Sequence, residues 1–255
     1  MYDPVQRHLA MEKLVVRDSP EGQEKRYWRF RPDRWYGGIA TADCAGCGLL
    51  CYFCWVREDV RNSPREIGKF YSPKKVAETL VSIARERGFR QLRVSGGEPT
   101  IGKLHLLQLL DNLQGQGCAF ILETCGIPLG YDQKYAEALS KYPFIHVRVS
   151  LKGCTEEEFS MLTGSKPEGF RLQLKALENL EKVNTAYHAS CMVSFSPEEN
   201  RRALLTRLRK ISSRLVDEFE VEEVILYDMV RSRLKQAGLR YYSAYSPHDV
   251  PKELV

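Results

Sequence analysis

Regularly spaced apolar positions divide most of the chain into alternating helices and strands. The clearest helix follows Ser72-Pro73, which supply a cap and a first-turn proline, and it ends before Gly88. Between these residues an apolar stripe repeats at helical spacing, at Val76, Ala77, Leu80, Val81 and Ala84. The sequence shows no internal repeat and no low-complexity tract, so periodicity of this kind also predicts the other elements.

Short apolar runs alternate with helical segments along the rest of the chain. We expect strands over residues 36–42, 91–95, 118–124, 145–151, 187–195 and 221–227, and helices near 104–113, 132–141, 170–180 and 204–211. Strands separated by helices indicate βαβ units and a parallel sheet. About six units are fewer than the eight of a closed barrel, so the predicted fold class is α/β, an incomplete (β/α)6 TIM-type barrel with outer helices. In such folds ligands bind at the carboxyl ends of the strands.

We expect one main domain. Residues 36–240 form the partial barrel, with an N-terminal extension at 1–35 and a C-terminal tail at 241–255. No apolar run approaches the roughly 20 residues that span a bilayer, and the N-terminus lacks the apolar core of a signal peptide, so we expect a cytoplasmic location. The net charge of +5 and the pI near 8.7 are compatible with an acidic partner such as RNA. The pI stays below the value of about 9 that marks dedicated nucleic-acid-binding domains.

The cysteines are concentrated directly after the first predicted strand. Four of the eight lie within eleven residues, at Cys44, Cys47, Cys51 and Cys54. Disulfide frameworks are typical of short secreted chains, so reduced thiols or metal ligands are the better interpretation. Three thiolates on one short loop can each bind one corner of a cubane cluster, which leaves the fourth iron open to substrate. Zinc is the alternative, but paired Cys-x2-Cys zinc sites usually separate the pairs by about a dozen residues or more, and here three intervene.

The spacing Cys47-x3-Cys51-x2-Cys54, with Phe53 directly before the last cysteine, resembles the signature of the radical S-adenosylmethionine (SAM) superfamily. The resemblance implies that these three cysteines hold a [4Fe–4S] cluster. It implies further that the amino and carboxylate groups of SAM chelate the open iron and that Phe53 packs near the adenine. Cys44 is then not a ligand but a loop thiol beside the site, with a redox or ligand role as the alternative.

Two further motifs at predicted strand ends are similar to those by which the superfamily binds SAM. The sequence Gly96-Gly97-Glu98 follows the second strand, and the two glycines let the backbone approach a ligand closely. The resemblance implies that this motif hydrogen-bonds the SAM amino group. The fourth strand ends in Ser150-Leu151-Lys152, which looks like a segment of the glycyl-radical-enzyme activases, the pyruvate formate-lyase activating enzyme-like proteins. By this carry-over Ser150 hydrogen-bonds SAM and Lys152 pairs with its carboxylate, a solvated lysine being the alternative.

The chain departs from the activase pattern at one group of positions. Activases place acidic residues around a monovalent cation at the ends of the third and fourth strands, where this chain has Glu123, Arg148 and Ser150. We hypothesise that the Arg148 guanidinium takes the place of the cation and pairs with Glu123.

The resemblance implies an activase-like oxidoreductase in which an electron donor such as flavodoxin or ferredoxin reduces the cluster. SAM is then cleaved, and the 5′-deoxyadenosyl radical abstracts hydrogen from a substrate. Compact length and the fourth-strand match favour a protein or peptide as that substrate. An RNA-modifying enzyme is the alternative, because Trp55 after Cys54 is similar to a run in wyosine-forming enzymes and the basic residues at 201–210 either meet phosphate or form a solvated helix face.

A non-catalytic iron–sulfur or zinc-binding module is a third interpretation, against which the Gly-Gly-Glu motif argues. No cysteine follows Cys191, which argues against a second cluster. We expect a monomer that binds no membrane. The sequence identifies neither the substrate nor a general acid or base.

Overall fold

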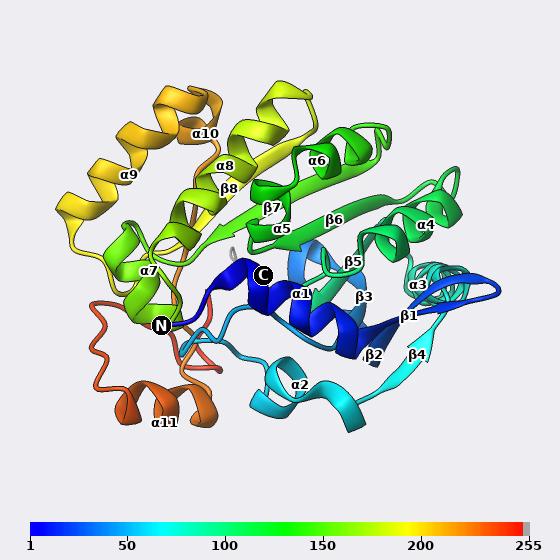
Figure 1. Ribbon diagram of the computed structural model, residues 1–255, viewed down its shortest axis with the longest axis horizontal. Helices are drawn as coiled ribbons and strands as arrows, with labels where there is room; N and C mark the ends of the chain where they lie inside the picture. Colours follow the sequence, from blue (N-terminus) through cyan, green and yellow to red (C-terminus); the bar gives the residue numbers. More distant parts are fainter. Residues whose placement is uncertain (252–255) are drawn as a thin grey trace.

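Six parallel strands form the centre of the molecule in the computed structural model, which describes residues 1–251. The strands are β3 (Ile39–Cys44), β5 (Gln91–Gly96), β6 (Ala119–Thr124), β7 (Ile145–Leu151), β8 (Tyr187–Met192) and β9 (Glu220–Glu222). Each pairs in parallel with the next in this order, so the chain builds the sheet from one edge to the other. The incomplete α/β barrel predicted from the sequence is thus confirmed (Figure 1).

Helices cover the outer face of this sheet (Figure 1). They are α3 (Pro73–Arg87), α4 (Lys103–Leu113), α5 (Ile127–Tyr131), α6 (Gln133–Leu139), α7 (Glu156–Thr163), α8 (Glu168–Lys182), α9 (Glu198–Ile211) and α10 (Arg214–Asp217). The predicted signals of α3 are present, because the Ser72 hydroxyl accepts a hydrogen bond from the Lys75 amide and Gly88 ends the helix in the left-handed conformation.

The N-terminal residues add strands that the apolar pattern does not predict. Helix α1 (Pro4–Val15) leads into the hairpin β1 (Val16–Ser19) and β2 (Gly22–Asp33). Strand β2 pairs antiparallel with β3 and with the short β4 (Lys69–Tyr71), so the sheet has nine strands and is mixed. Residues 1–35 therefore contribute to the sheet, and the division into extension, barrel and tail stays a prediction.

The predicted bounds of the first and last parallel strands are wrong. Strand β3 begins at Ile39 rather than at residue 36, because Tyr36 lies in a 3-10 turn (Trp35–Gly37) with φ of 58° and cannot continue a strand. Strand β9 ends at Glu222 rather than at residue 227. Its partner β8 ends at Met192, and beyond it the Val224 amide donates to the Ser194 hydroxyl instead.

The C-terminal segment returns to the open edge of the half-barrel. Helix α11 (Asp228–Gln236) follows β9, and the Tyr242 amide then donates to the Ser194 carbonyl at 2.7 Å. Helix α2 (Glu58–Asn62) and a 3-10 turn (Pro64–Glu66) lie between the cysteine segment and β4. Residues 252–255 of the predicted tail lie outside the described residues. None of the helices within residues 1–251 is both long and apolar enough to cross a membrane.

The two faces of the parallel sheet differ in chemistry. Alternate side chains point to the outer, helix-covered face and are apolar: Ala40, Ala42, Leu92, Val94, Phe120, Leu122, Val147, Val149, Tyr187 and Ala189. The side chains between them point to the opposite face, which we call the inner face. Apart from Ile121 they are mostly polar, and they include Thr41, Asp43, Arg93, Ser95, Glu123, Arg148, Ser150, Ser190, Glu220 and Glu222. A closed barrel usually fills this space with branched apolar residues, so the inner face is not an ordinary packed core.

Candidate functional site

The cysteine segment forms a loop between β3 and α2, at the carboxyl end of the first parallel strand. The beginning of the loop is hydrogen-bonded to the helix that follows it, because the Gly46 amide donates to the Val60 carbonyl at 2.8 Å and the Cys47 amide to the Arg61 carbonyl at 2.9 Å. The N-terminus covers the loop, since the Leu50 amide donates to the Tyr2 hydroxyl at 2.9 Å. All these cysteines are free thiols.

The three predicted ligands are not arranged as a single-ion site. Burial raises the pKa of Cys51 to about 11 and also raises the pKa of Cys47, so the site needs a cationic group to hold thiolates. A zinc ion with Zn–S bonds of about 2.3 Å brings its sulfurs within about 3.8 Å of one another. Among the described residues no group of metal-ligating atoms within 4.8 Å includes Cys47, Cys51 or Cys54. The three thiols are therefore not gathered as closely as the sulfurs of a tetrahedral zinc site.

Cys44 belongs to strand β3, whereas the other three cysteines lie on the loop that follows it. It is the last residue of β3 and is fully buried, and burial raises the pKa of its thiol. Its carbonyl accepts a hydrogen bond from the Gly97 amide at 2.8 Å. These contacts agree with the prediction that Cys44 is not a ligand, which stays a prediction.

The Gly-Gly-Glu motif binds the cysteine loop through its backbone. A Cβ atom on Gly97 would stand 2.3 Å from the Gly46 carbonyl oxygen, and the Glu98 amide donates to the same oxygen at 2.8 Å. We expected these glycines to let the backbone approach a ligand closely, but the structure shows that the backbone approaches the cysteine loop instead. Gly96, with φ of 84°, turns the chain at the end of β5.

The Glu98 carboxylate is buried and engaged by the protein. It accepts hydrogen bonds from the Thr100 amide and hydroxyl, from the Thr124 hydroxyl and from the Cys125 amide, at 2.6–3.1 Å. Burial opposes ionisation, but the nearby His8 and these donors outweigh it and lower the pKa of Glu98. The carboxylate holds the ends of β5 and β6 together, a role that the motif did not reveal.

His8, Glu98 and Cys125 are the one set of three potential metal ligands that lie close together in the described residues. Hydrogen bonds to other groups already occupy this set. The His8 Nδ1–H donates to the Pro4 carbonyl at 2.7 Å, and its other nitrogen lies 3.5 Å from the Cys125 sulfur. Burial lowers the pKa of His8 and raises that of Cys125. Hydrogen bonds therefore explain why these three side chains lie together, and no metal ion is needed to explain it. His8 comes from α1 and carries no sequence signal of this role.

Phe53, Ser150 and Lys152 lie together beside the cysteine loop. The Lys152 ammonium is 5.9 Å from the centre of the Phe53 ring and donates to the Ser150 hydroxyl at 2.6 Å. Burial alone would lower the pKa of Lys152, but Glu222 and the Cys51 thiol outweigh it and raise the value. Ser150 is the only hydrogen-bond partner of this ammonium in the described part of the chain, so other donor hydrogens remain for an anion.

Glu222 completes this corner and was not identified from the sequence. It accepts hydrogen bonds from Ser150 at 3.0 Å and Ser190 at 3.0 Å, and it pairs with Arg148 at 2.6 Å. Burial opposes its ionisation, but Arg148 and Lys152 hold the pKa of Glu222 below its usual value. The available signal was that Glu220 and Glu222 are alternate residues of the last strand and so point to the same face of the sheet.

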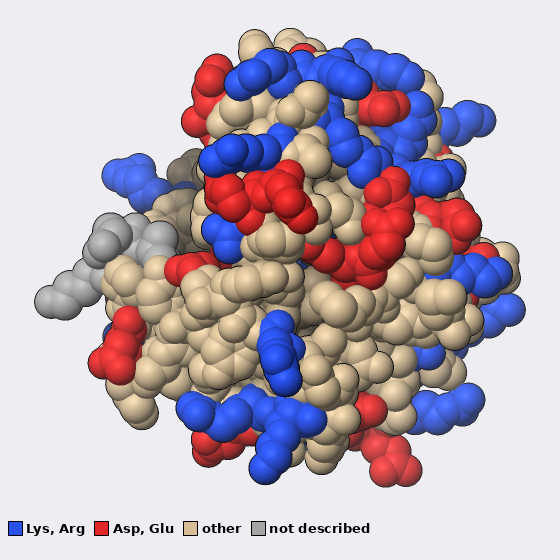
Figure 2. Space-filling view, turned by 90° about the vertical axis from the view of Figure 1, so that its left-hand side faces the viewer, with Lys and Arg blue, Asp and Glu red and all other residues tan. Residues whose placement is uncertain are grey.

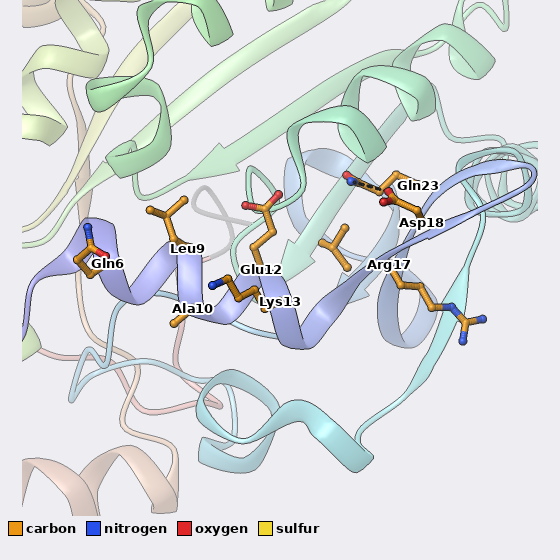
Figure 3. Close-up of a pocket in the computed structure, with 9 residues that line it drawn as sticks. Gln6, Leu9, Ala10, Glu12, Lys13, Arg17, Asp18 and Gln23 are labelled. Atoms are coloured by element: carbon orange, nitrogen blue, oxygen red, sulfur yellow. Dashed lines mark hydrogen bonds between the residues drawn. The ribbon is translucent and has the colours of Figure 1, made fainter.

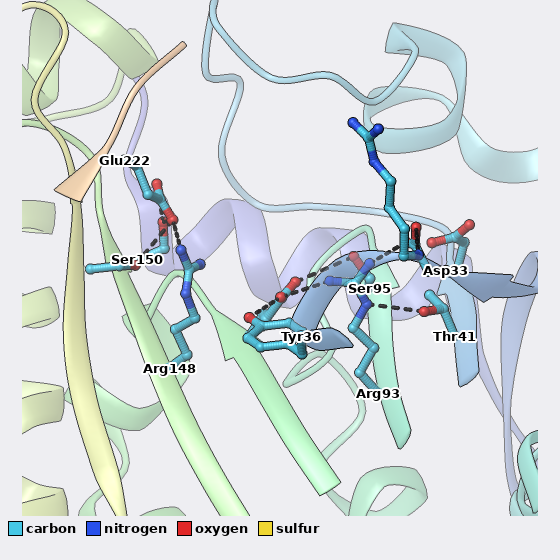
Figure 4. A network of polar contacts seen from close by, with 12 residues as sticks. Asp33, Tyr36, Thr41, Arg93, Ser95, Arg148, Ser150 and Glu222 are labelled. Atoms are coloured by element: carbon cyan, nitrogen blue, oxygen red, sulfur yellow. Dashed lines mark hydrogen bonds and ion pairs between the residues drawn. The ribbon is translucent and has the colours of Figure 1, made fainter. Parts of the chain in front are cut away.

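The predicted pairing of Arg148 with Glu123 is wrong. Arg148 lies beside Glu123 in register, yet it pairs with Glu220 and Glu222 on β9, while Glu123 accepts from Tyr36 at 2.6 Å and from Arg93 at 2.8 Å. Each carboxylate has its own partners, so the inner face carries two networks (Figure 4). One joins Ser150, Arg148 and Glu222; the other joins Asp33, Arg93, Thr41 and Tyr36.

A shallow hollow also lies outside this site. It is lined by α1 and the β1–β2 hairpin, including Glu12, Lys13, Arg17 and Asp18 (Figure 3). None of the predicted site residues borders it.

Comparison with known proteins supports these assignments at the level of the family. The Radical SAM superfamily model matches residues 43–207. A protein of Methanococcus vannielii named "Probable GTP 3',8-cyclase" is 34% identical over 123 residues, which are 48% of this chain and 38% of that protein. A protein of the same name from Archaeoglobus fulgidus is 32% identical over 169 residues, 64% of this chain and 48% of that protein. The chain thus spans less than half the length of these curated relatives.

Solved structures share the fold. SuiB of Streptococcus suis bound to S-adenosylmethionine gives a TM-score of 0.58 at 20% identity, over 72% of this chain and 40% of that one. TYW1 with a lysine-pyruvate adduct bound gives 0.51 at 14% identity, over 93% of this chain and 89% of that one. With the family match over residues 43–207, the chain belongs to the radical SAM superfamily, and its cofactors are a [4Fe–4S] cluster and SAM.

Proposed function

We propose that Cys47, Cys51 and Cys54 bind the [4Fe–4S] cluster and that SAM lies between the cysteine loop and the ends of β5 and β7. Phe53 packs on the adenine, and Lys152 pairs with the SAM carboxylate. The remaining contacts come from Gly96, Gly97 and Ser150. Glu98 holds the motif in place beside them, because its carboxylate is engaged by Thr100, Thr124 and Cys125 and its amide by the Gly46 carbonyl.

One observation carries this proposal. The Lys152 ammonium is half-enclosed beside Phe53, with the Cys51 thiol close enough to raise its pKa and with a single hydrogen-bond partner among the described residues. Glu222 lies near this cation without accepting a hydrogen bond from it, so the unused donors of Lys152 are free to bind a further anion. The carboxylate of SAM, held at the open iron of a cluster on this loop, is such an anion.

When bound and reduced, the cluster and SAM supply a 5′-deoxyadenosyl radical that abstracts a hydrogen atom from the substrate. The chain's own residues bind and orient SAM, and α1 covers the loop through contacts of His8 with Gly48 and of Met11 with Gly46. This cover keeps water away from the site. The electron comes from a donor of the flavodoxin or ferredoxin class.

The substrate we propose is a small polar molecule that lies on the inner face. The charged groups there remain partly open to solvent, because the exposed fractions of the side chains are 42% for Glu220, 21% for Glu123 and 12% for Arg148. Charges of both signs at the middle of a sheet suit a ligand with several hydrogen-bonding groups. The curated relatives, which are named as probable GTP 3',8-cyclases, also support a small molecule as the substrate.

A polypeptide substrate, as in an activase, is the second candidate. Its support is the likeness to SuiB, which has been solved bound to the precursor peptide SuiA, with a TM-score of 0.57 at 18% identity over 79% of this chain and 47% of that one.

RNA has weaker support. Basic side chains gather over α9 at the top of Figure 2, but acidic side chains lie directly beneath them. Arg202 pairs with Glu198 at 3.0 Å and Arg207 with Glu156 at 2.8 Å, while Arg201 donates to backbone carbonyls. These internal pairs favour a solvated helix face.

The experiment follows deuterium into 5′-deoxyadenosine. Reduced, cluster-loaded protein is incubated with SAM and, separately, with the small-molecule, protein and RNA fractions of a fully deuterated extract. The proposal predicts deuterium transfer from the small-molecule fraction and none with Cys47→Ala. Deuterium transfer from the protein fraction alone would establish a polypeptide substrate, and transfer from the RNA fraction alone would establish an RNA substrate.

A further inference from the structure

Two arginine side chains lie against the cysteine loop without carboxylate partners. Arg61, on α2, is 3% exposed, and its Nη1 donates to the Cys51 carbonyl at 2.8 Å. Arg233, on α11, donates from Nη2 to the Cys54 carbonyl. The two come from segments far apart in the sequence and meet at the same loop.

Both guanidinium groups are incompletely satisfied. The Nε atom of Arg61 and the Nη1 atom of Arg233 are buried and have no hydrogen-bond partner. No carboxylate among residues 1–251 lies within ion-pair distance of either group. Buried cations usually pair with acidic side chains. Arg61 is buried without such a pair, and the half-buried Arg233 has Glu58 nearby but outside ion-pair distance, so the two charges are only partly compensated.

An anion at the cysteine loop would compensate the rest of this charge. A cubane held by three thiolates is an anion, and its reduction adds one more negative charge. Arg61 also binds Cys47 through its backbone, since its carbonyl accepts from the Cys47 amide at 2.9 Å. Each of the three proposed ligands is therefore in contact with one of these two arginines.

We propose that Arg61 and Arg233 are positioning residues that stabilise the reduced form of the cluster and so raise its reduction potential. The inference rests on the proposed function. It differs from that function in naming two residues, one of them in the C-terminal helix α11, that contact neither SAM nor substrate. Their charge, rather than their hydrogen bonds alone, makes the cluster reducible by a physiological donor.

The test is the midpoint potential of the cluster-loaded protein, measured by electron paramagnetic resonance during redox titration without SAM. Arg233→Met is expected to lower the potential, so that the ratio of reduced to oxidised cluster at a fixed potential falls on the order of tenfold, equal to about 59 mV for one electron. Arg233→Lys keeps the charge and is expected to restore most of the wild-type potential. Arg231→Met removes an exposed charge from the same helix and should leave the potential unchanged.

Iron content and thermal unfolding accompany each titration. An unchanged potential in fully loaded Arg233→Met and in Arg61→Gln, which keeps a donor for the Cys51 carbonyl, would overturn the inference. Loss of cluster in Arg233→Met but not in Arg233→Lys supports the inference. Equal loss in both variants contradicts it, because the shape of the Arg233 side chain would then matter rather than its charge. Failure of the wild type to bind a cluster or cleave SAM would instead refute the proposed function.

Discussion

Substitution of Gly97 by alanine tests the contact that joins the Gly-Gly-Glu motif to the cysteine loop. The new Cβ would stand 2.3 Å from the Gly46 carbonyl oxygen and 3.0 Å from the Cys44 carbonyl oxygen. Both atoms belong to the backbone and cannot rotate away. The loop must therefore move, and it carries the three proposed cluster ligands.

The expected cost comes from two sources. Forcing one extra methyl group into a packed site costs about 1–3 kcal/mol. The shift also weakens the hydrogen bonds from Gly97 N to Cys44 O and from Glu98 N to Gly46 O, each worth about 1 kcal/mol. Together the free energy of unfolding should fall by roughly 2–5 kcal/mol.

The assay is urea unfolding together with iron content after anaerobic reconstitution. Gly117→Ala is the control, because Gly117 has a positive φ of 71° but an added Cβ would meet no atom within 4 Å. It should lose only about 1 kcal/mol from backbone strain and keep its cluster. Full cluster loading of Gly97→Ala, with an unfolding free energy no lower than that of the control, would refute the reasoning.

Two other results are expected. Lys152→Met should raise the Kd for SAM on the order of tenfold to a hundredfold, because a charge-assisted hydrogen bond contributes about 1.5–3 kcal/mol. Anaerobic calorimetry measures this Kd, and an effect no larger than that of the exposed Lys166→Met would contradict the prediction. Burial lowers the pKa of His105 from 6.5 to about 3, so below pH 6.5 the unfolded chain binds a proton that the folded chain does not. Stability should therefore fall by about 2 kcal/mol between pH 6.5 and 5 through this group, and His105→Gln should remove that part of the pH dependence; identical slopes in both proteins would argue against it.

The parallel sheet could be predicted because its signals are local. Strands such as Ile145–Leu151 alternate apolar and polar residues, and α3 has its cap directly before it and its glycine stop directly after it. Strand β2 was missed because Gly22–Asp33 is rich in charged and aromatic residues, whose inward-facing members pair with Asp43 and Arg93 from other strands. Such pairs exist only after folding.

The candidate site divides in the same way. The cysteine spacing and the strand-end motif are contiguous, so they could be found in the sequence. Glu222 and Arg233 reach the site from the last strand and the last helix, and their local sequence does not show which residues they contact. The pairing of Arg148 was mispredicted because register places it beside Glu123, whereas the long side chain reaches the two carboxylates of β9.

The most direct test of the central claim is 5′-deoxyadenosine formation by the reduced, reconstituted protein, measured with its iron content. Wild type, Cys44→Ala and Cys118→Ala should bind the cluster and release 5′-deoxyadenosine from SAM. Cys47→Ala, Cys51→Ala and Cys54→Ala should each lose both. Retention of cluster and SAM cleavage in any of these three, or their loss in Cys44→Ala while the protein remains folded, would contradict the account.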